Sequence, residues 1–266
     1  MHYVDEGAGA PILLLHGEPT WAYLYRKAIP ALARAGRVVA PDYFGFGRSD
    51  KPTDPGWYSY DRHYESVERL VTGLELEGLT VVVHDWGGPI GLRLAVTRPD
   101  LVERIVVLNT GIGAGRAPSE TWLRFREMVR RVGPDLSAGR MVAPGCARAL
   151  SDEAAAAYDA PFPTPESKAG LIAFPELVPT ELDHPSAKAM LEVREALKGW
   201  TRPALVLFGD SDPIFPPDAA ERMAALIAGA GPAETLAHAG HFVQEDAGDE
   251  LGERVAQFAG GTARSV

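Results

Sequence analysis

The 266-residue chain contains a single cysteine, Cys146, so it can form neither an intramolecular disulfide nor a zinc site built from several thiolates. It lacks an apolar run of the roughly 18 residues needed to cross a membrane, and it lacks the charged and then apolar order of a signal peptide. Positive charge is scarce, with 26 Lys and Arg against 36 Asp and Glu and a net charge of −10. We therefore expect a cytoplasmic protein that binds neither nucleic acid nor a membrane.

Signatures of bound cofactors are also missing. The sequence has no G-x-x-x-x-G-K-[ST] phosphate-binding loop and no His-x-x-x-His metal-binding pair. What is present is the composition of an ordinary globular protein, 46% apolar and 23% charged, with 28 Gly and 22 Pro that follow no period. No cofactor and no metal are expected.

Short apolar runs rich in β-branched residues alternate with longer segments of helical character. The runs show no polar alternation, which is typical of strands buried on both faces; they are residues 11–15, 38–40, 80–83, 104–108 and 204–208. Helices are predicted at residues 63–77, 88–97, 186–198, 218–227 and 250–258. This alternation predicts an α/β fold with a mostly parallel central sheet flanked by helices.

Residues 111–180 have a different sequence pattern. Helices are expected at residues 120–131 and 151–158, separated by Pro-rich breaks, and no strand run occurs. The pattern favours one α/β core made of residues 1–110 and 181–266, with residues 111–180 inserted as a helical cap. An insertion that leaves the carboxyl end of a parallel strand would cover the place where such sheets bind ligands.

A carboxylate stands at the turn between the strand at residues 80–83 and the next helix. In Val83-His84-Asp85-Trp86-Gly87-Gly88, the small residues after Asp85 permit a sharp turn, as in the nucleophile elbow G-x-S-x-G, with Asp in place of Ser. The following helix directs its N-terminal N–H groups at the negative charge. The alternative interpretation is an aspartate that only caps that helix.

Three further segments supply the partners that a nucleophile needs. The turn HGEPTW at residues 16–21 can lend a backbone N–H to an oxyanion hole. Asp210 and Asp212 follow the strand at residues 204–208, and His241 lies near the C-terminus. The resulting order of nucleophile, acid and histidine is the order found in α/β-hydrolases. Asp210 competes with Asp212 for the role of the acid.

These segments identify a resemblance that covers nearly the whole chain, residues 16–245. The strings HGEPTWAYLYRK, PDYFGFGRSDKP, VVHDWGG, AYDAPFP and AGHFVQE resemble the haloalkane dehalogenases of the α/β-hydrolase superfamily, especially the subgroup with an Asp-His-Asp triad. The resemblance implies Asp85 as nucleophile, His241 as general base and Asp212 as the acid that orients it. It also places the oxyanion hole at the backbone N–H groups of Glu18 and Trp86.

The implied reaction is hydrolysis of a haloalkane, a small apolar substrate, to an alcohol and a halide through an alkyl ester on Asp85. An aspartate suits this reaction because a carboxylate can attack saturated carbon without first losing a proton. Trp86 would donate its indole N–H to the leaving halide. The family's second donor is a cap tryptophan or an asparagine in the HG-x-P turn, but Phe125 and Glu18 fall at those places. Trp122, one turn before Phe125, is the candidate that remains.

Two alternative functions share this fold. An epoxide hydrolase uses the same nucleophile and histidine but needs tyrosines in the cap, where Tyr158 is the only one. A non-catalytic small-molecule receptor could use the same scaffold without forming an ester. Asn109 occupies the place where another subgroup carries a glutamate, so the acid must come from the later loop.

The opening residues, Met1 to Gly7, resemble the second core strand of the family. We therefore expect the family's N-terminal first strand to be missing from this sequence. A sheet edge left open in this way can pair with another chain, which predicts a monomer or a weak homodimer.

Overall fold

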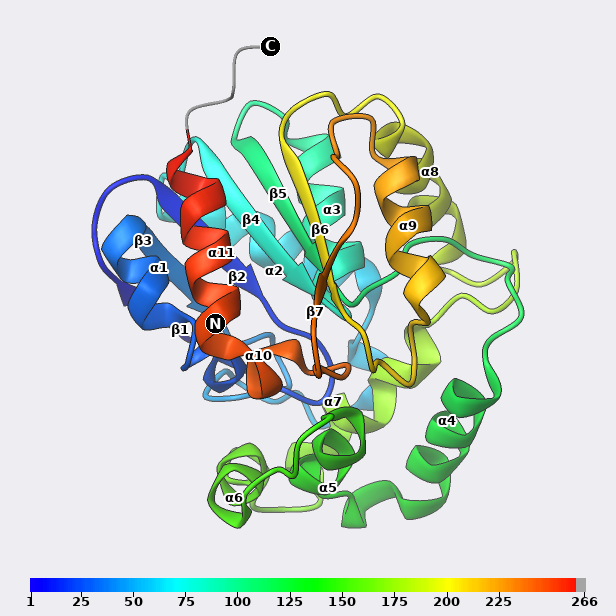
Figure 1. Ribbon diagram of the computed structural model, residues 1–266. Coiled ribbons are helices and arrows are strands. Elements are labelled where there is room, and N and C mark those ends of the chain that lie inside the picture. The colour runs from blue at the N-terminus through cyan, green and yellow to red at the C-terminus, as the bar shows by residue number, and fades with distance from the viewer. Residues whose placement is uncertain (262–266) are drawn as a thin grey trace.

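The computed structural model describes residues 1–261 and contains a seven-stranded sheet at its centre (Figure 1). Its strands are β1 (Tyr3–Glu6), β2 (Pro11–Leu15), β3 (Arg37–Pro41), β4 (Leu79–His84), β5 (Val102–Leu108), β6 (Ala204–Gly209) and β7 (Glu234–Leu236). They follow the order β1-β3-β2-β4-β5-β6-β7, in which only β1 is antiparallel to its neighbour. The predicted mostly parallel α/β sheet is thus confirmed, with β1 as an edge strand.

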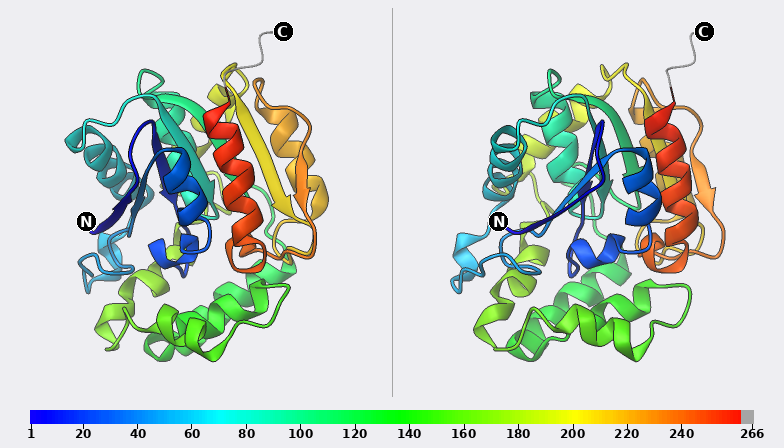
Figure 2. Two further views of the ribbon diagram at one scale, coloured as in Figure 1. Left: turned by 60° about the vertical axis from the view of Figure 1, so that its left-hand side comes forward. Right: turned by 90° about the vertical axis from the view of Figure 1, so that its left-hand side faces the viewer.

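Helices cover both faces of the sheet. The helices α1 (Ile29–Ala35) and α11 (Gly248–Gly260) pack together on one face, whereas α2 (Tyr60–Gly73), α3 (Gly87–Thr97) and α8 (Ala187–Leu197) pack on the other (Figure 2). The helix α9 (Pro217–Leu226) contacts β6, and the short α10 (Val243–Asp246) leads into α11. None of the helices within residues 1–261 combines the length and apolarity needed to span a bilayer.

The insertion between β5 and β6 is helical, as expected. It contains α4 (Glu120–Val132), α5 (Ala138–Val142), α6 (Asp152–Asp159) and α7 (Ala169–Ala173), together with short 3-10 turns. Within the described residues it contributes no strand to the sheet. Figures 1 and 2 show these helices as a separate layer beyond the carboxyl ends of the parallel strands.

One predicted helix has different bounds in the structure, and one observed strand was not predicted. The helix expected at residues 63–77 begins at Tyr60, because the Ser59 hydroxyl accepts a hydrogen bond from the Arg62 N–H and caps the first turn; it ends at Gly73. The strand β7 was not predicted, since it has only three residues and two of them are exposed. Its pairing with β6 defines it as a strand.

The first turn of α3 lies against β2 at a distance that only glycine permits. A Cβ atom added to Gly87 would lie 2.2 Å from the backbone oxygen of Leu15, which belongs to β2 and cannot move aside. This close approach fixes the turn between β4 and α3 relative to the neighbouring strand. The residue at the apex of that turn is Asp85.

Replacement of Gly87 by alanine should therefore strain the elbow. We expect Gly87→Ala to lower the free energy of unfolding by about 1–3 kcal/mol, the usual range for overpacking. Urea denaturation measures the change. The control is Gly73→Ala at the end of α2, where an added Cβ meets nothing within 4 Å and should stabilise the helix. Equal effects of the two variants would contradict this account.

Candidate active site

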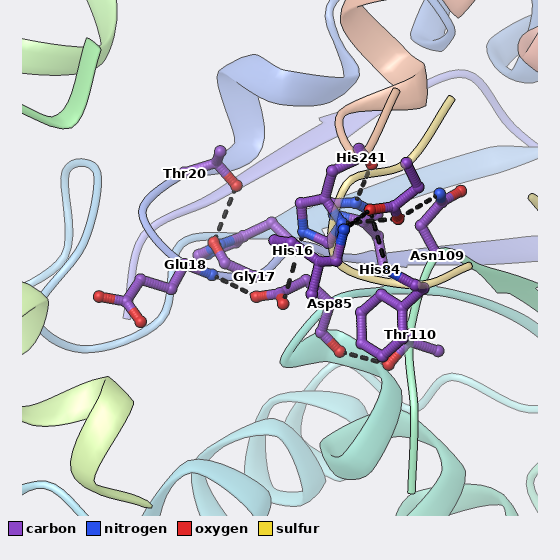
Figure 3. Close-up of polar contacts among 12 residues, drawn as sticks. His16, Gly17, Glu18, Thr20, His84, Asp85, Asn109, Thr110 and His241 are labelled. Atoms are coloured by element: carbon purple, nitrogen blue, oxygen red, sulfur yellow. Dashed lines mark hydrogen bonds and ion pairs between the residues drawn. The ribbon is translucent and has the colours of Figure 1, made fainter. Parts of the chain in front are cut away.

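Asp85 occupies the sharp turn between β4 and α3 in a strained backbone conformation, with φ of 48°. Its carbonyl oxygen accepts hydrogen bonds from the Gly88 N–H at 2.9 Å and from the Thr110 hydroxyl at 2.6 Å, and its N–H donates to the Asn109 oxygen at 3.2 Å (Figure 3). The N-cap residue of α3 is Trp86, and no side chain caps the helix. The carboxylate of Asp85 is therefore not used for capping.

The two carboxylate oxygens of Asp85 have different neighbours. Oδ1 accepts a hydrogen bond of 2.8 Å from the Glu18 N–H, and Oδ2 lies 3.6 Å from Nε2 of His241. Burial acts to raise the pKa of the Asp85 carboxyl, but the hydrogen bond and charge of His241 outweigh it, so the pKa lies below its usual value. Asp85 is thus kept as an anion, the form that attacks carbon.

His241 lies between two carboxylates and is 1% exposed. Its Nδ1 is 3.0 Å from Oδ2 of Asp212, on the side of the ring opposite Asp85. Burial opposes a charge on the ring, but Asp212 and then Asp85 outweigh it and raise the pKa of His241 to about 10. The His241 carbonyl accepts a hydrogen bond of 2.8 Å from Nε2 of His84, which ties this loop to β4.

Of the two candidate acids, only Asp212 contacts His241. Its Oδ1 accepts the N–H groups of Ile214 and Phe215 at 2.6 and 3.0 Å, and its Oδ2 accepts Nδ2 of Asn109 at 2.6 Å. Asp210 is exposed, and its carboxylate accepts the Ser211 hydroxyl and the N–H groups of His238 and Ala239 instead. The geometry therefore favours Asp212 as the partner of the histidine.

Asn109 and Thr110 take part in this network, although the sequence assigned neither of them a role. Both follow β5, at the carboxyl end of the sheet. The Asn109 side chain donates to Asp212 and accepts the Gly209 N–H at 3.1 Å, so it joins the ends of β5 and β6. The signals in the sequence were the position of a polar pair directly after a buried strand and, for Asn109, its place where another subgroup carries a glutamate.

The loop that carries Glu18 is held by a buried histidine. Nε2 of His16 accepts the Tyr43 N–H at 3.1 Å, so Nδ1 carries the proton and donates to the Gly17 oxygen at 3.0 Å. The Thr20 hydroxyl donates to the same oxygen at 2.8 Å. These bonds fix the peptide whose N–H reaches Asp85.

The Glu18 side chain is an uncompensated buried carboxyl group. It is 7% exposed, and its Oε1 has no hydrogen-bond partner among the described residues. Figure 3 shows it extending away from the Asp85 carboxylate. Burial, and then the negative charge of Asp85, raise the pKa of Glu18 well above its usual value of 4.5. Near pH 4.5 and for some distance above it, Glu18 is therefore a neutral acid.

A cavity of about 920 Å³ opens above Asp85 and is lined mostly by apolar residues. Trp86, Trp122, Phe125 and His241 are among its lining residues. The indole N–H of Trp86 makes no hydrogen bond within residues 1–261, and the guanidinium of Arg126 lies 4.7 Å from the centre of the Trp122 ring. Trp122 and Phe125, the two aromatic residues singled out in the cap, thus both line the cavity.

The cavity has no tyrosine among its described lining residues. Tyr158, the tyrosine predicted in the insertion, is fully buried elsewhere. Its hydroxyl donates to Oε1 of Glu245 at 2.5 Å, in a cluster that also contains Arg26. A tyrosine that could protonate an opening epoxide is therefore not found in the part of the wall that the structure describes.

The raised pKa of Glu18 predicts a pH-dependent loss of stability. A carboxyl group whose pKa is higher in the folded state binds a proton that the unfolded chain has already released, so stability falls as the pH rises from about 4.3 through the folded pKa. Glu18→Gln removes this loss. We expect its Tm to exceed that of the wild type by an amount that grows across this interval.

Thermal unfolding between pH 4 and 8 tests this prediction. The matched control is Glu77→Gln, which replaces an exposed glutamate that makes no ion pair in the described residues. A difference between Glu18→Gln and the wild type that stays constant with pH would mean that Glu18 is charged in the folded protein.

The pKa of His241 should depend on Asp212 and not on Asp210. Because Asp212 is the main cause of the raised pKa of His241, Asp212→Asn should lower that pKa toward its ordinary value of about 6.5. Titration of the imidazole resonances by NMR measures it. Asp210→Asn, which changes the neighbouring acid that does not contact the ring, should leave the pKa in place; equal shifts in both variants would refute the assignment.

Comparison with known proteins agrees with this geometry. The family described as the alpha/beta hydrolase fold matches residues 10–248. A haloalkane dehalogenase of Mycobacterium marinum is 45% identical, over 96% of this chain and 87% of that protein, and one of Psychrobacter cryohalolentis is 40% identical, over 97% and 86%. A tetrameric haloalkane dehalogenase structure from Paraglaciecola agarilytica has a TM-score of 0.89 at 35% identity and covers 99% of this chain and 88% of its own.

The resemblance found in the sequence is thereby confirmed at the level of the family. The relatives align over nearly the full length of this chain, so the match includes the sheet, the insertion and all the segments that form the site. The chain belongs to the haloalkane dehalogenase family of α/β-hydrolases.

Proposed function

We propose that the protein hydrolyses haloalkanes to an alcohol and a halide through an alkyl ester on Asp85. The observation that carries this proposal is the environment of Asp85. It is an anion on a strained turn, with one oxygen bound by the Glu18 N–H and the other next to His241, and it faces an apolar cavity. Such a site suits an uncharged alkyl substrate.

In the first step, Oδ2 of Asp85 attacks the carbon that carries the halogen. The new C–O bond forms as the carbon–halogen bond breaks, and the halide leaves with the bonding electron pair. The Glu18 N–H binds the other oxygen throughout and keeps the carboxylate oriented. No proton moves in this step.

The leaving halide needs hydrogen-bond donors. The Trp86 indole N–H is the first, since it lies in the cavity wall and has no protein partner within residues 1–261. Trp122 in α4 is the second, because Phe125 lines the same wall but has no N–H to donate. Residues 111–180 act in this proposal as a cap that completes the halide site above the α/β core.

In the second step, water attacks the ester carbon while His241 takes its proton. Before the reaction, two carboxylates raise the pKa of His241 to about 10, so the ring is protonated. The ester removes the negative charge of Asp85, so the pKa of His241 falls, and the ring releases its proton to solvent and can then act as a base. The Glu18 and Trp86 backbone N–H groups stabilise the oxyanion. When the oxyanion collapses, the leaving alkoxide takes the proton from His241 and departs as the alcohol, and the carboxyl of Asp85 returns a proton to His241 and is again a carboxylate.

The alternative functions find less support. An epoxide hydrolase would need an acid on the cap side of the cavity, and Tyr158 is bonded to Glu245 outside it. A receptor would not need the Asp85–His241–Asp212 arrangement. For the assembly we propose a monomer or a weak homodimer, with the edge strand β1 as the contact.

The covalent intermediate gives a direct test. In His241→Phe the ester should form but not hydrolyse, so intact-mass analysis after incubation with 1-bromobutane should reveal one butyl group attached to Asp85. His241→Phe combined with Asp85→Asn should show no adduct. The wild type should release bromide, and in heavy-oxygen water a single turnover should place the label in Asp85, since water attacks the carbon of the enzyme's own carboxyl group.

The absence of both bromide release and an adduct would overturn the proposal. The same mass assay with an epoxide then decides for the second candidate, because an epoxide would leave a hydroxyalkyl group on Asp85. A protein that binds these compounds without forming any adduct would be a receptor.

A further inference from the structure

The titratable residues of the cavity wall fall into two sets. Three of them, Glu18, Asp85 and His241, belong to the catalytic end. All other charged residues that line the cavity are arginines: Arg116, Arg124, Arg194 and Arg222. The chain as a whole has 36 acidic and 26 basic residues, so an all-arginine set runs against its composition.

These arginines come from four different segments. Arg116 lies in the loop after β5, Arg124 in α4, Arg194 in α8 and Arg222 in α9. The helices α4, α8 and α9 follow one another along the right-hand side of Figure 1, beside that loop. Segments that are far apart in the sequence therefore bring the same charge to one cavity.

Two of the four positive charges are compensated and two are not. Arg124 pairs with Glu120 and Arg222 pairs with Asp218, in both cases one helical turn away. Arg116 and Arg194 make no ion pair within the described residues. The loop that carries Arg116 also passes close to Arg194, because Cδ of Arg194 lies 3.6 Å from the position of a Cβ added to Gly113 in that loop.

We infer that the protein prefers haloalkanes that carry a terminal carboxylate, which Arg116 and Arg194 bind while the carbon–halogen bond lies at Asp85. The inference rests on the proposed function and names the substrate class of the same site. A cavity of about 920 Å³ has room for such a chain, and it is near the upper end of the range for small-molecule sites. Guanidinium groups bind carboxylates with directional hydrogen bonds.

The effect of the substrate's carboxylate on the reaction should depend on the length of the substrate's carbon chain. The anionic Asp85 repels a carboxylate held close to it, so a short haloacid should be a poor substrate. In a longer molecule the carboxylate reaches the arginines and is attracted instead. The preference for the acid over an uncharged analogue should therefore change sign as the chain grows, which apolar packing alone would not produce.

The experiment compares ω-bromoalkanoates with ω-bromoalkanamides of the same length, from two to ten carbons, by bromide release. The amide keeps the size but has no charge. We expect the ratio of kcat/KM, acid over amide, to be below one for the shortest pair and to rise to about three- to thirtyfold for the long pairs, the range for two exposed ion pairs. A non-halide salt should reduce this preference.

Variants locate the effect. Arg116→Gln/Arg194→Gln should bring the ratio for long chains close to one, and Arg116→Glu/Arg194→Glu should invert it. Arg140→Gln is the matched control, since Arg140 is an exposed arginine of α5 that does not line the cavity; it should keep the ratio of the wild type.

The outcomes separate this inference from the proposed function. If the amides and simple bromoalkanes release bromide but the ratio never exceeds one, the inference is wrong and the dehalogenase proposal stands. A ratio above one that the double Gln variant does not change also refutes the inference, because residues other than Arg116 and Arg194 would then bind the carboxylate of the substrate. If no bromo compound reacts, the proposed function itself fails.

Discussion

The site is organised around the buried negative charge of Asp85, which must stay open to the cavity on one side. A carboxylate in an apolar cavity is unstable unless donors and positive charges compensate it. Here the Glu18 N–H and the protonated His241 do so, and Asp212 in turn compensates the histidine. The strained turn and the Asn109 bridge hold these groups in place, and Asp85 lines the cavity.

The balance of charge around His241 also changes in the course of the proposed reaction. His241 lies between two anions, and the proposed reaction removes one of them when the ester forms. The same ring can therefore be an ion-pair partner in the free enzyme and, once it has released its proton to solvent, a base in the intermediate. Glu18 shows the opposite case, since its carboxyl lacks a partner and is kept neutral by burial and by the charge of Asp85.

The main strands and the position of Asp85 at a sharp turn could be predicted from the sequence because their signals are local. Runs such as residues 80–83 and the small residues after Asp85 contain the information within a few positions. The strand β7 gave no such signal, since its three residues become a strand only by pairing with β6. The hydrogen bond from Asn109 to Asp212 joins residues 103 positions apart, and the choice between Asp210 and Asp212 likewise depended on how one loop folds toward His241.

The origin of each group has a consequence for how the protein can change. Asp85, His241 and Asp212 all follow strands or loops of the α/β sheet, and the bond from His84 to the His241 backbone ties the histidine to β4 itself. Trp122 and Arg124 belong to residues 111–180, where both lie in α4. Substitutions in that segment, other than at the proposed halide donor Trp122, can thus alter which molecules are accepted without changing Asp85, His241 or Asp212. Selection, in nature or in the laboratory, can thus change the substrate range while the residues supplied by the α/β core stay the same.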